Sequence, residues 1–105
     1  MLQHKVADRP NDLKVRFGGE EILILWYDIA PAKLASKIQT LMQDIRALVI
    51  AVEPGMPPIN LTASAGVIHL IPQTELDPLQ LLRDVDGLLY QAKNQGRNRV
   101  ISEAR

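Results

Sequence analysis

The chain has 105 residues, no cysteine and an apolar fraction of 47%. This length allows one domain with a modest core, and the apolar fraction argues against a disordered chain. Basic and acidic residues number 12 each, so the charge balance favours neither a nucleic-acid polymer nor a membrane surface as partner. We expect a cytoplasmic α/β domain, because the longest apolar run, ILILWY, is too short to span a membrane and the N-terminus lacks a signal-peptide core.

The first expected element is a β-hairpin. Residues 13–17 (LKVRF) alternate between apolar and charged side chains, which predicts a strand with one face in water. Gly18 and Gly19 follow, and a Gly-Gly pair between two strand patterns predicts a tight turn. The next run, residues 22–27, is apolar on both faces. It predicts a central strand that is covered on both sides.

A helix, a loop and a long strand are expected next. Pro31 suits the first turn of a helix. The predicted buried stripe of this helix is Leu34, Ile38, Leu41, Ile45 and Leu48, widened by Ala35, Met42 and Val49. Residues 53–58 (EPGMPP) cannot continue a helix or a central strand, so they predict a loop. Residues 59–71 predict one long strand, whose small residues TASAG indicate that another element packs closely over it.

A second helix and a last strand complete the chain. Asp77 and Pro78 predict an N-cap followed by the first helical turn, and Gly96 predicts the end of the helix. The predicted buried positions are Leu81, Leu82, Val85, Leu88, Leu89 and Ala92. Gly87 lies inside the helix and costs about 1 kcal/mol relative to alanine. Residues 98–102 (NRVIS) predict a short strand, which gives the order β-β-α-β-α-β.

Two adjacent glutamates follow the glycine turn. At a tight turn the carboxylates of Glu20 and Glu21 can both reach one site, and such oxygen ligands suit Mg²⁺ together with substrate phosphates. The glycines also allow a polyanion to approach the backbone amides. A solvated acidic hairpin tip fits the same residues, so both interpretations stay open.

Basic residues surround the predicted end of the second helix. Lys93 and Arg97 are four residues apart and share a face if the helix reaches Gly96. A lysine ammonium and a planar arginine guanidinium placed together can hold a triphosphate. Cations at a helix C-terminus also complement the helix dipole, which is the structural alternative.

Arg9 and Asp12 precede the first strand, three residues apart on a turn. This spacing lets them contact a nucleotide base edge or a phosphate. It equally allows a local salt bridge that contributes little to stability. The two residues alone do not separate these interpretations.

Together these motifs resemble the GGDEF family of diguanylate cyclases. Residues 18–22 (GGEEI) are similar to the family's GG[D/E]EF signature, with Ile22 in place of Phe. Residues 12–17 (DLKVRF) resemble the segment that leads into it, and residues 64–67 (SAGV) resemble the family's S-[I/A]-G-[V/I] strand. Residues 81–100 resemble the terminal helix and the AKxxGRN element.

The resemblance implies bacterial signal transduction, in which two GTP molecules are condensed into cyclic di-GMP with release of two pyrophosphates. Each GTP is held by one domain of a homodimer. By motif position, Gly18 and Gly19 form the nucleotide-binding turn. Glu20 and Glu21 are implied to bind Mg²⁺ or Mn²⁺ and to help activate the attacking ribose 3′-hydroxyl.

The resemblance also assigns the basic residues. Lys93 and Arg97 are implied to bind the triphosphate, where cations and metal neutralise charge on the α-phosphate and leaving group. Arg9 and Asp12 fall at the family's RxxD product-inhibition site, which binds cyclic di-GMP away from the catalytic centre.

The chain departs from the family pattern ahead of the hairpin. No D-x-D-x-F-K or G-H-x-x-G-D pattern occurs, so the family's first strand, with its metal-binding Asp, has no counterpart. We expect one α+β domain over residues 1–105, a partial ferredoxin-like, nucleotidyl-cyclase-like GGDEF fold without the family's first strand and first helices. The strands at 22–27 and 59–71 would then each carry an unpaired edge.

Two functions follow from this comparison of motifs. The first is a diguanylate cyclase domain that is inactive as this chain alone, because a complete metal site and a base-reading pocket need the upstream residues. The alternative is a non-catalytic regulatory module that binds cyclic di-GMP through Arg9 and Asp12.

Overall fold

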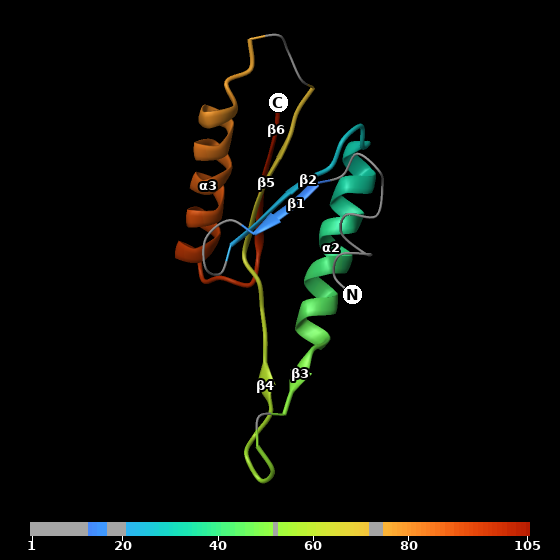
Figure 1. Cartoon of the computed structure of the whole chain (residues 1–105), viewed down its shortest axis with the longest axis vertical. Coiled ribbons are helices and arrows are strands. Elements are labelled where there is room, and N and C mark those ends of the chain that lie inside the picture. The colour runs from blue at the N-terminus through green and yellow to red at the C-terminus, as the bar shows by residue number, and fades with distance from the viewer. Residues whose placement is uncertain (1–12, 17–20, 52, 72–74) are drawn as a thin grey trace. The chain divides into compact units, whose positions relative to one another are not determined.

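A computed structural model describes residues 13–16, 21–51, 53–71 and 75–105 (Figure 1). The fold is mixed α+β, and its contacts divide into two units, Met1–Leu41 and Met42–Arg105. The described elements, in chain order, are β1 (Leu13–Arg16), β2 (Ile22–Leu25), α2 (Pro31–Ala47), β3 (Val49–Ile50), β4 (Ile59–Asn60), β5 (Ala65–His69), α3 (Pro78–Asn94) and β6 (Val100–Ala104).

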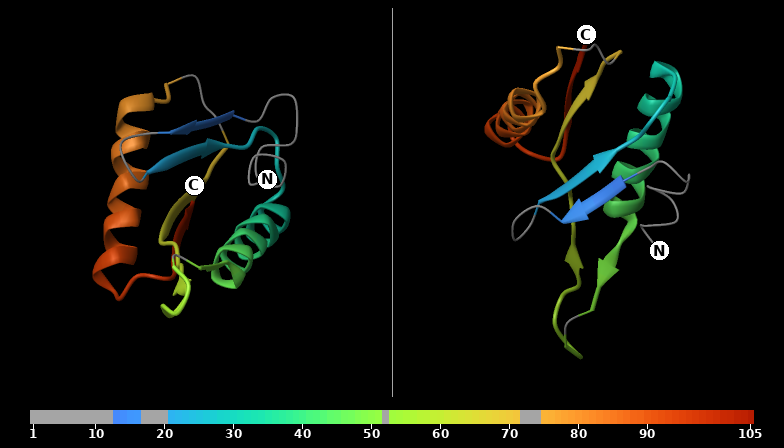
Figure 2. Two further views of the ribbon diagram at one scale, coloured as in Figure 1. Left: turned by 60° about the horizontal axis from the view of Figure 1, so that its bottom comes forward. Right: turned by 45° about the horizontal axis from the view of Figure 1, so that its top comes forward.

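The first two strands form the predicted hairpin. β1 and β2 are antiparallel, with Leu13 opposite Leu25 and Arg16 opposite Ile22 (Figure 2). The chain therefore reverses direction between Arg16 and Ile22, as the glycine pair predicted. The glycines themselves lie outside the described residues.

The prediction that residues 22–27 form a covered central strand is wrong. β2 ends at Leu25, and Ile22 and Leu25 are 55% and 54% exposed. An apolar run is buried on both faces only where other elements cover both, and a two-stranded antiparallel pair does not supply such cover. Within the described ranges β2 pairs with β1, and β5 pairs with β6.

Helix α2 begins at Pro31, as predicted. Its buried side chains follow the predicted spacing and are Leu34, Ile38 and Met42, at 7%, 8% and 3% exposure. The helix ends at Ala47, so Leu48 and Val49 do not extend the stripe. Val49 and Ile50 are β-branched and enter the short strand β3, where that side-chain shape is favoured.

The long strand predicted over residues 59–71 is divided in two. β4 pairs antiparallel with β3 around the loop predicted at 53–58, in which Gly55 has φ +86°. β5 pairs instead with β6 in parallel, beginning where the Ala65 N–H donates to the Arg99 carbonyl at 3.0 Å. The two halves of the segment therefore serve different partner strands, and residues 61–64 between them belong to neither ladder.

Strands β5 and β6 and helix α3 form a β-α-β unit, with α3 lying alongside both strands (Figure 1). The helix starts at the predicted cap, where the Leu79 N–H donates to Asp77 Oδ1 at 3.0 Å. Its Ala92 is fully buried. The close packing predicted over TASAG is confirmed at Gly66, since a Cβ there would lie 2.5 Å from the Leu89 nitrogen.

The last strand begins two residues later than predicted. Arg97 and Asn98 have φ of 65° and 49°, in the left-handed region, so neither can belong to a strand. β6 starts at Val100, where the backbone is extended again.

Candidate functional site

The acidic part of the predicted site lies at the start of β2. Glu21 is half-buried and immediately precedes Ile22, opposite the end of β1. The other residues assigned to the turn and to the inhibitory site lie outside the described residues: Arg9, Asp12, Gly18, Gly19 and Glu20.

The donor chemistry of the glutamate pair fits a hard divalent cation. Carboxylate oxygens are the ligands that Mg²⁺ prefers, and it keeps several waters and substrate phosphates besides. Among the described residues no cluster of three or more His, Asp or Glu side chains is found that could hold a metal. Of the predicted glutamate pair only Glu21 lies in the described part, where it belongs to no such cluster.

The basic part of the site lies at the end of α3. The helix ends at Asn94, so Lys93 occupies its last turn and Arg97 follows on the loop. The prediction that both share one helical face fails, because it required the helix to reach Gly96. That glycine has φ +121°, a conformation that a helix does not contain.

The loop nevertheless brings the two cations to one helix end. The Arg97 N–H donates to the Ala92 carbonyl at 2.9 Å, and the Gln95 N–H donates to the Gln91 carbonyl at 2.9 Å. These bonds fold the chain back over the last turn, where carbonyl groups otherwise lack partners. Arg97 is exposed and Lys93 half-buried, so a phosphate group can reach this end of the helix.

Arg99, which belongs to the same basic run, supports the loop. Its Nε donates to the Arg97 carbonyl at 3.0 Å. Its guanidinium lies 2.8 Å from the position that a Cβ at Gly96 would take. Because these contacts engage the Arg99 side chain with the turn, Arg97 is the better candidate for a ligand contact.

The sequence analysis did not assign a role in this region to Arg46 or to Asn98. Arg46, in the last turn of α2, donates from Nε to Asn98 Oδ1 at 2.7 Å. The Asn98 N–H donates to Ser64 Oγ at 3.2 Å. The available sequence signal was Asn98 itself, since asparagine tolerates the left-handed conformation better than most residues.

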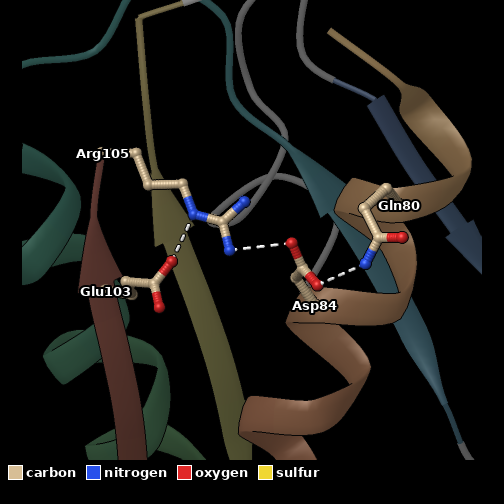
Figure 3. A network of polar contacts seen from close by, with 4 residues as sticks. All are labelled: Gln80, Asp84, Glu103 and Arg105. Atoms are coloured by element: carbon tan, nitrogen blue, oxygen red, sulfur yellow. Dashed lines mark hydrogen bonds and ion pairs between the residues drawn. The ribbon is translucent and has the colours of Figure 1, made fainter.

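A second polar network joins α3 to the end of β6 (Figure 3). Arg105 contacts Glu103 and lies 2.8 Å from Asp84 Oδ2, while Gln80 donates to Asp84 Oδ1 at 2.8 Å. The hydrogen bonds from Gln80 and from Arg105 lower the pKa of Asp84 below 3.8. The hydrogen bonds to Glu103 and Asp84 raise the pKa of Arg105.

This network lies away from the residues predicted to bind phosphate. Gln80 and Asp84 lie in the first half of α3, whereas Lys93 lies in its last turn. The Arg105 N–H also donates to the His69 carbonyl at 2.8 Å, which extends the parallel ladder to the last residue. The sequence pattern did not predict this network, because its link between Asp84 and Arg105 joins two separate segments of the chain.

Within the described ranges, no helix has the length and apolar character needed to cross a membrane.

Comparisons with known proteins bear on the whole chain. The family model described as "Diguanylate cyclase, GGDEF domain" matches residues 2–99. Diguanylate cyclase DgcM of Escherichia coli K12 is 38% identical over 95 residues, and response regulator PleD of Caulobacter vibrioides is 32% identical over 96. These matches cover 90% and 91% of this chain but 21% of each relative. The chain thus spans about a fifth of the length of these curated relatives.

Solved structures give the same fold. The GGDEF domain of DgcB from Caulobacter crescentus, crystallised with c-di-GMP, has a TM-score of 0.78 at 22% identity, covering 93% of this chain and 56% of that one. Diguanylate cyclase SiaD from Pseudomonas aeruginosa, in complex with its activator SiaC, has a TM-score of 0.72 at 26% identity, covering 90% and 35%. Since the family model spans nearly all of its residues, this chain belongs to the GGDEF family of diguanylate cyclase domains.

Proposed function

We propose that this domain binds GTP and takes part in the condensation of two GTP molecules into cyclic di-GMP. The observation that carries the proposal is the conformation of residues 95–99, the α3–β6 loop. This loop returns Arg97 to the helix end that bears Lys93. That pair matches the family's phosphate-binding motif in residue type and spacing. GTP as substrate also makes the cytoplasm the expected compartment.

In this proposal the basic pair binds the triphosphate. The planar guanidinium of Arg97 suits two phosphate oxygens at once, and Lys93 supplies a compact charge beside it. As the 3′-hydroxyl of one GTP attacks the α-phosphate of the other, the pyrophosphate that leaves gains negative charge. Fixed cations at this position stabilise that charge more in the transition state than in the bound substrate.

The match to the family's signature assigns the glutamate pair a different role, in metal binding and in activation of the attacking hydroxyl. Glu20 and Glu21 would hold Mg²⁺ or Mn²⁺, whose chemistry when bound is to stabilise charge on phosphate and on the attacking oxygen. A carboxylate of the pair accepts the proton of the ribose 3′-hydroxyl. Each domain holds one GTP, so the reaction needs two domains face to face. We propose that the 105-residue chain alone is inactive, because neither the D-x-D-x-F-K nor the G-H-x-x-G-D pattern of the family occurs in it.

Calorimetry with GTP and Mg²⁺ tests the phosphate site without requiring turnover. Lys93→Ala and Arg97→Ala should each weaken binding by about tenfold to a hundredfold, the range for losing a charged hydrogen bond. Arg83→Ala, an exposed arginine in the first half of α3, is the matched control and should bind as the natural chain does. Equal GTP affinity in all four proteins would refute the phosphate site.

The second candidate is a module that binds cyclic di-GMP without catalysis. It rests on Arg9 and Asp12, which stand in RxxD spacing five residues ahead of the glycine pair. Calorimetry with cyclic di-GMP should then show binding that Arg9→Ala abolishes. The same affinity in both proteins, or no binding in either, removes this candidate.

A further inference from the structure

The α3–β6 loop is held from outside by a residue of another helix. Arg46 lies 52 positions before Asn98 and donates from Nε to its side-chain oxygen at 2.7 Å. A second donor of the same guanidinium, one of its terminal nitrogens, lies 3.5 Å from the Asn98 carbonyl oxygen. The short first bond carries the interaction, because a separation of 3.5 Å is at the limit for a hydrogen bond.

The residue that Arg46 holds is one of two adjacent residues in an unusual conformation. Arg97 and Asn98 have φ of 65° and 49°. Left-handed residues without glycine are disfavoured, and they persist where the surroundings determine them. Here the Asn98 N–H is bonded to Ser64 Oγ at 3.2 Å, while its side chain is bonded to Arg46. Asn98 is thus fixed at both its backbone and its side chain, directly beside Arg97.

We propose that Arg46 is a positioning residue for phosphate binding, acting through Asn98 to hold the loop that presents Arg97. This inference rests on the proposed function of Arg97 as a phosphate ligand. Arg46 itself is engaged with Asn98 and does not have to touch the ligand. Preorganising the loop lowers the ordering cost of binding, which appears as affinity.

Two other roles for Arg46 make different predictions. If Arg46 contacted phosphate itself, its removal would weaken binding whether or not Asn98 had a side chain. If Arg46 contributed only positive charge, lysine at that position would serve as well. The guanidinium fork and the ammonium differ in geometry, so Arg46→Lys separates charge from the specific bond to Asn98.

The test is a set of NMR titrations with inorganic tripolyphosphate and with GTP, each in the presence of Mg²⁺. Backbone amides of Lys93 and Arg97 report binding, and the exchange rate of the Asn98 amide reports the loop. The variants are Arg46→Ala, Arg46→Lys, Asn98→Gly and the double variant Arg46→Ala/Asn98→Gly. Glycine adopts positive φ without strain, so Asn98→Gly removes the acceptor and not the backbone conformation. Arg83→Ala again serves as the charge-matched control.

We expect Arg46→Ala and Asn98→Gly each to weaken tripolyphosphate binding by about threefold to tenfold, the range for one ordinary hydrogen bond, because Arg46 acts on binding only through the loop. The double variant should bind no more weakly than either single variant, because both remove the same interaction. Arg46→Lys should stay below the natural affinity. The Asn98 amide should exchange faster in Arg46→Ala, while thermal midpoints stay close together.

Three results would overturn the inference while leaving the proposed function intact. The first two are a tripolyphosphate affinity equal to that of the natural chain in Arg46→Ala or in Arg46→Lys. The third is a double variant whose loss of binding free energy equals the sum of the losses in the two single variants. Absence of tripolyphosphate and GTP binding to the natural chain would instead refute the proposed function, and the phosphate role of Arg46 with it. An unchanged exchange rate of the Asn98 amide in Arg46→Ala would separately refute the claim that Arg46 stabilises the loop.

Discussion

Replacing Gly66 by alanine should strongly destabilise the packing of α3 on β5. The new Cβ would lie 2.5 Å from the Leu89 nitrogen, 2.5 Å from the Val85 carbonyl oxygen and 2.9 Å from the Leu88 Cβ. Ordinary contacts between such atoms are about 3.5–4.0 Å long. Two of the three atoms belong to the helix backbone and cannot rotate away, so α3 would have to shift by about 1 Å.

The expected loss is about 3 kcal/mol in the free energy of unfolding, at the upper end for overpacked cores. Gly66 does not have a positive φ, so alanine adds no backbone strain and the loss is steric. A domain of this kind has about 5–15 kcal/mol in all, so this one methyl group removes a large share of it.

Gly87→Ala is the matched control, since it adds the same methyl group to an exposed position of α3. A Cβ at Gly87 meets nothing within 4 Å. Its helix position makes alanine favourable by about 0.5–1 kcal/mol. Urea unfolding followed by circular dichroism should therefore move the two midpoints in opposite directions. A Gly66→Ala midpoint equal to that of the natural chain would refute the close packing.

Three further predictions concern stability. Asp77→Ala should lower the free energy of unfolding by about 1 kcal/mol, since it removes the cap of α3, and thermal unfolding measures this. Gly96→Ala should cost about 1–3 kcal/mol because its φ of +121° strains any side-chain-bearing residue, which urea unfolding would show; no loss would contradict the turn geometry. Asp84 has a lowered pKa, so its contribution to stability is full above its unfolded pKa and is lost as pH falls through the folded value. Asp84→Asn should therefore flatten the fall in stability measured as the pH drops below about 5, and an unchanged slope would contradict the network.

Local chemistry predicted the helices well. These signals depend only on residues within one turn of the helix. α2 begins at Pro31, and α3 begins at Pro78 with Asp77 as its cap, as the sequence predicted. The strands were less predictable because their limits depend on partners. The split of residues 59–71 follows from β3 on one side and β6 on the other, and neither partner is visible in the segment's own pattern.

In the candidate site, too, local sequence predicted the residue types but not the contacts with distant segments. The motif gave Lys93 and Arg97 by residue type, while the loop that joins them departs from the helical face expected. The role of Arg46 could not be predicted from the sequence, since its partner Asn98 is 52 residues away and neither residue alone indicates the other. Long-range side-chain pairs of this kind arise only when the elements are already placed.

Synthesis of cyclic di-GMP is the most direct measure of the central claim. The chain, and the chain extended upstream in its own reading frame, would be incubated with GTP and Mg²⁺ and the products separated by chromatography and identified by mass. We predict cyclic di-GMP and pyrophosphate from the extended protein, loss of both in its Glu21→Gln and Lys93→Ala variants, and none from the 105 residues alone. An extended protein that folds and forms no cyclic di-GMP would contradict the account.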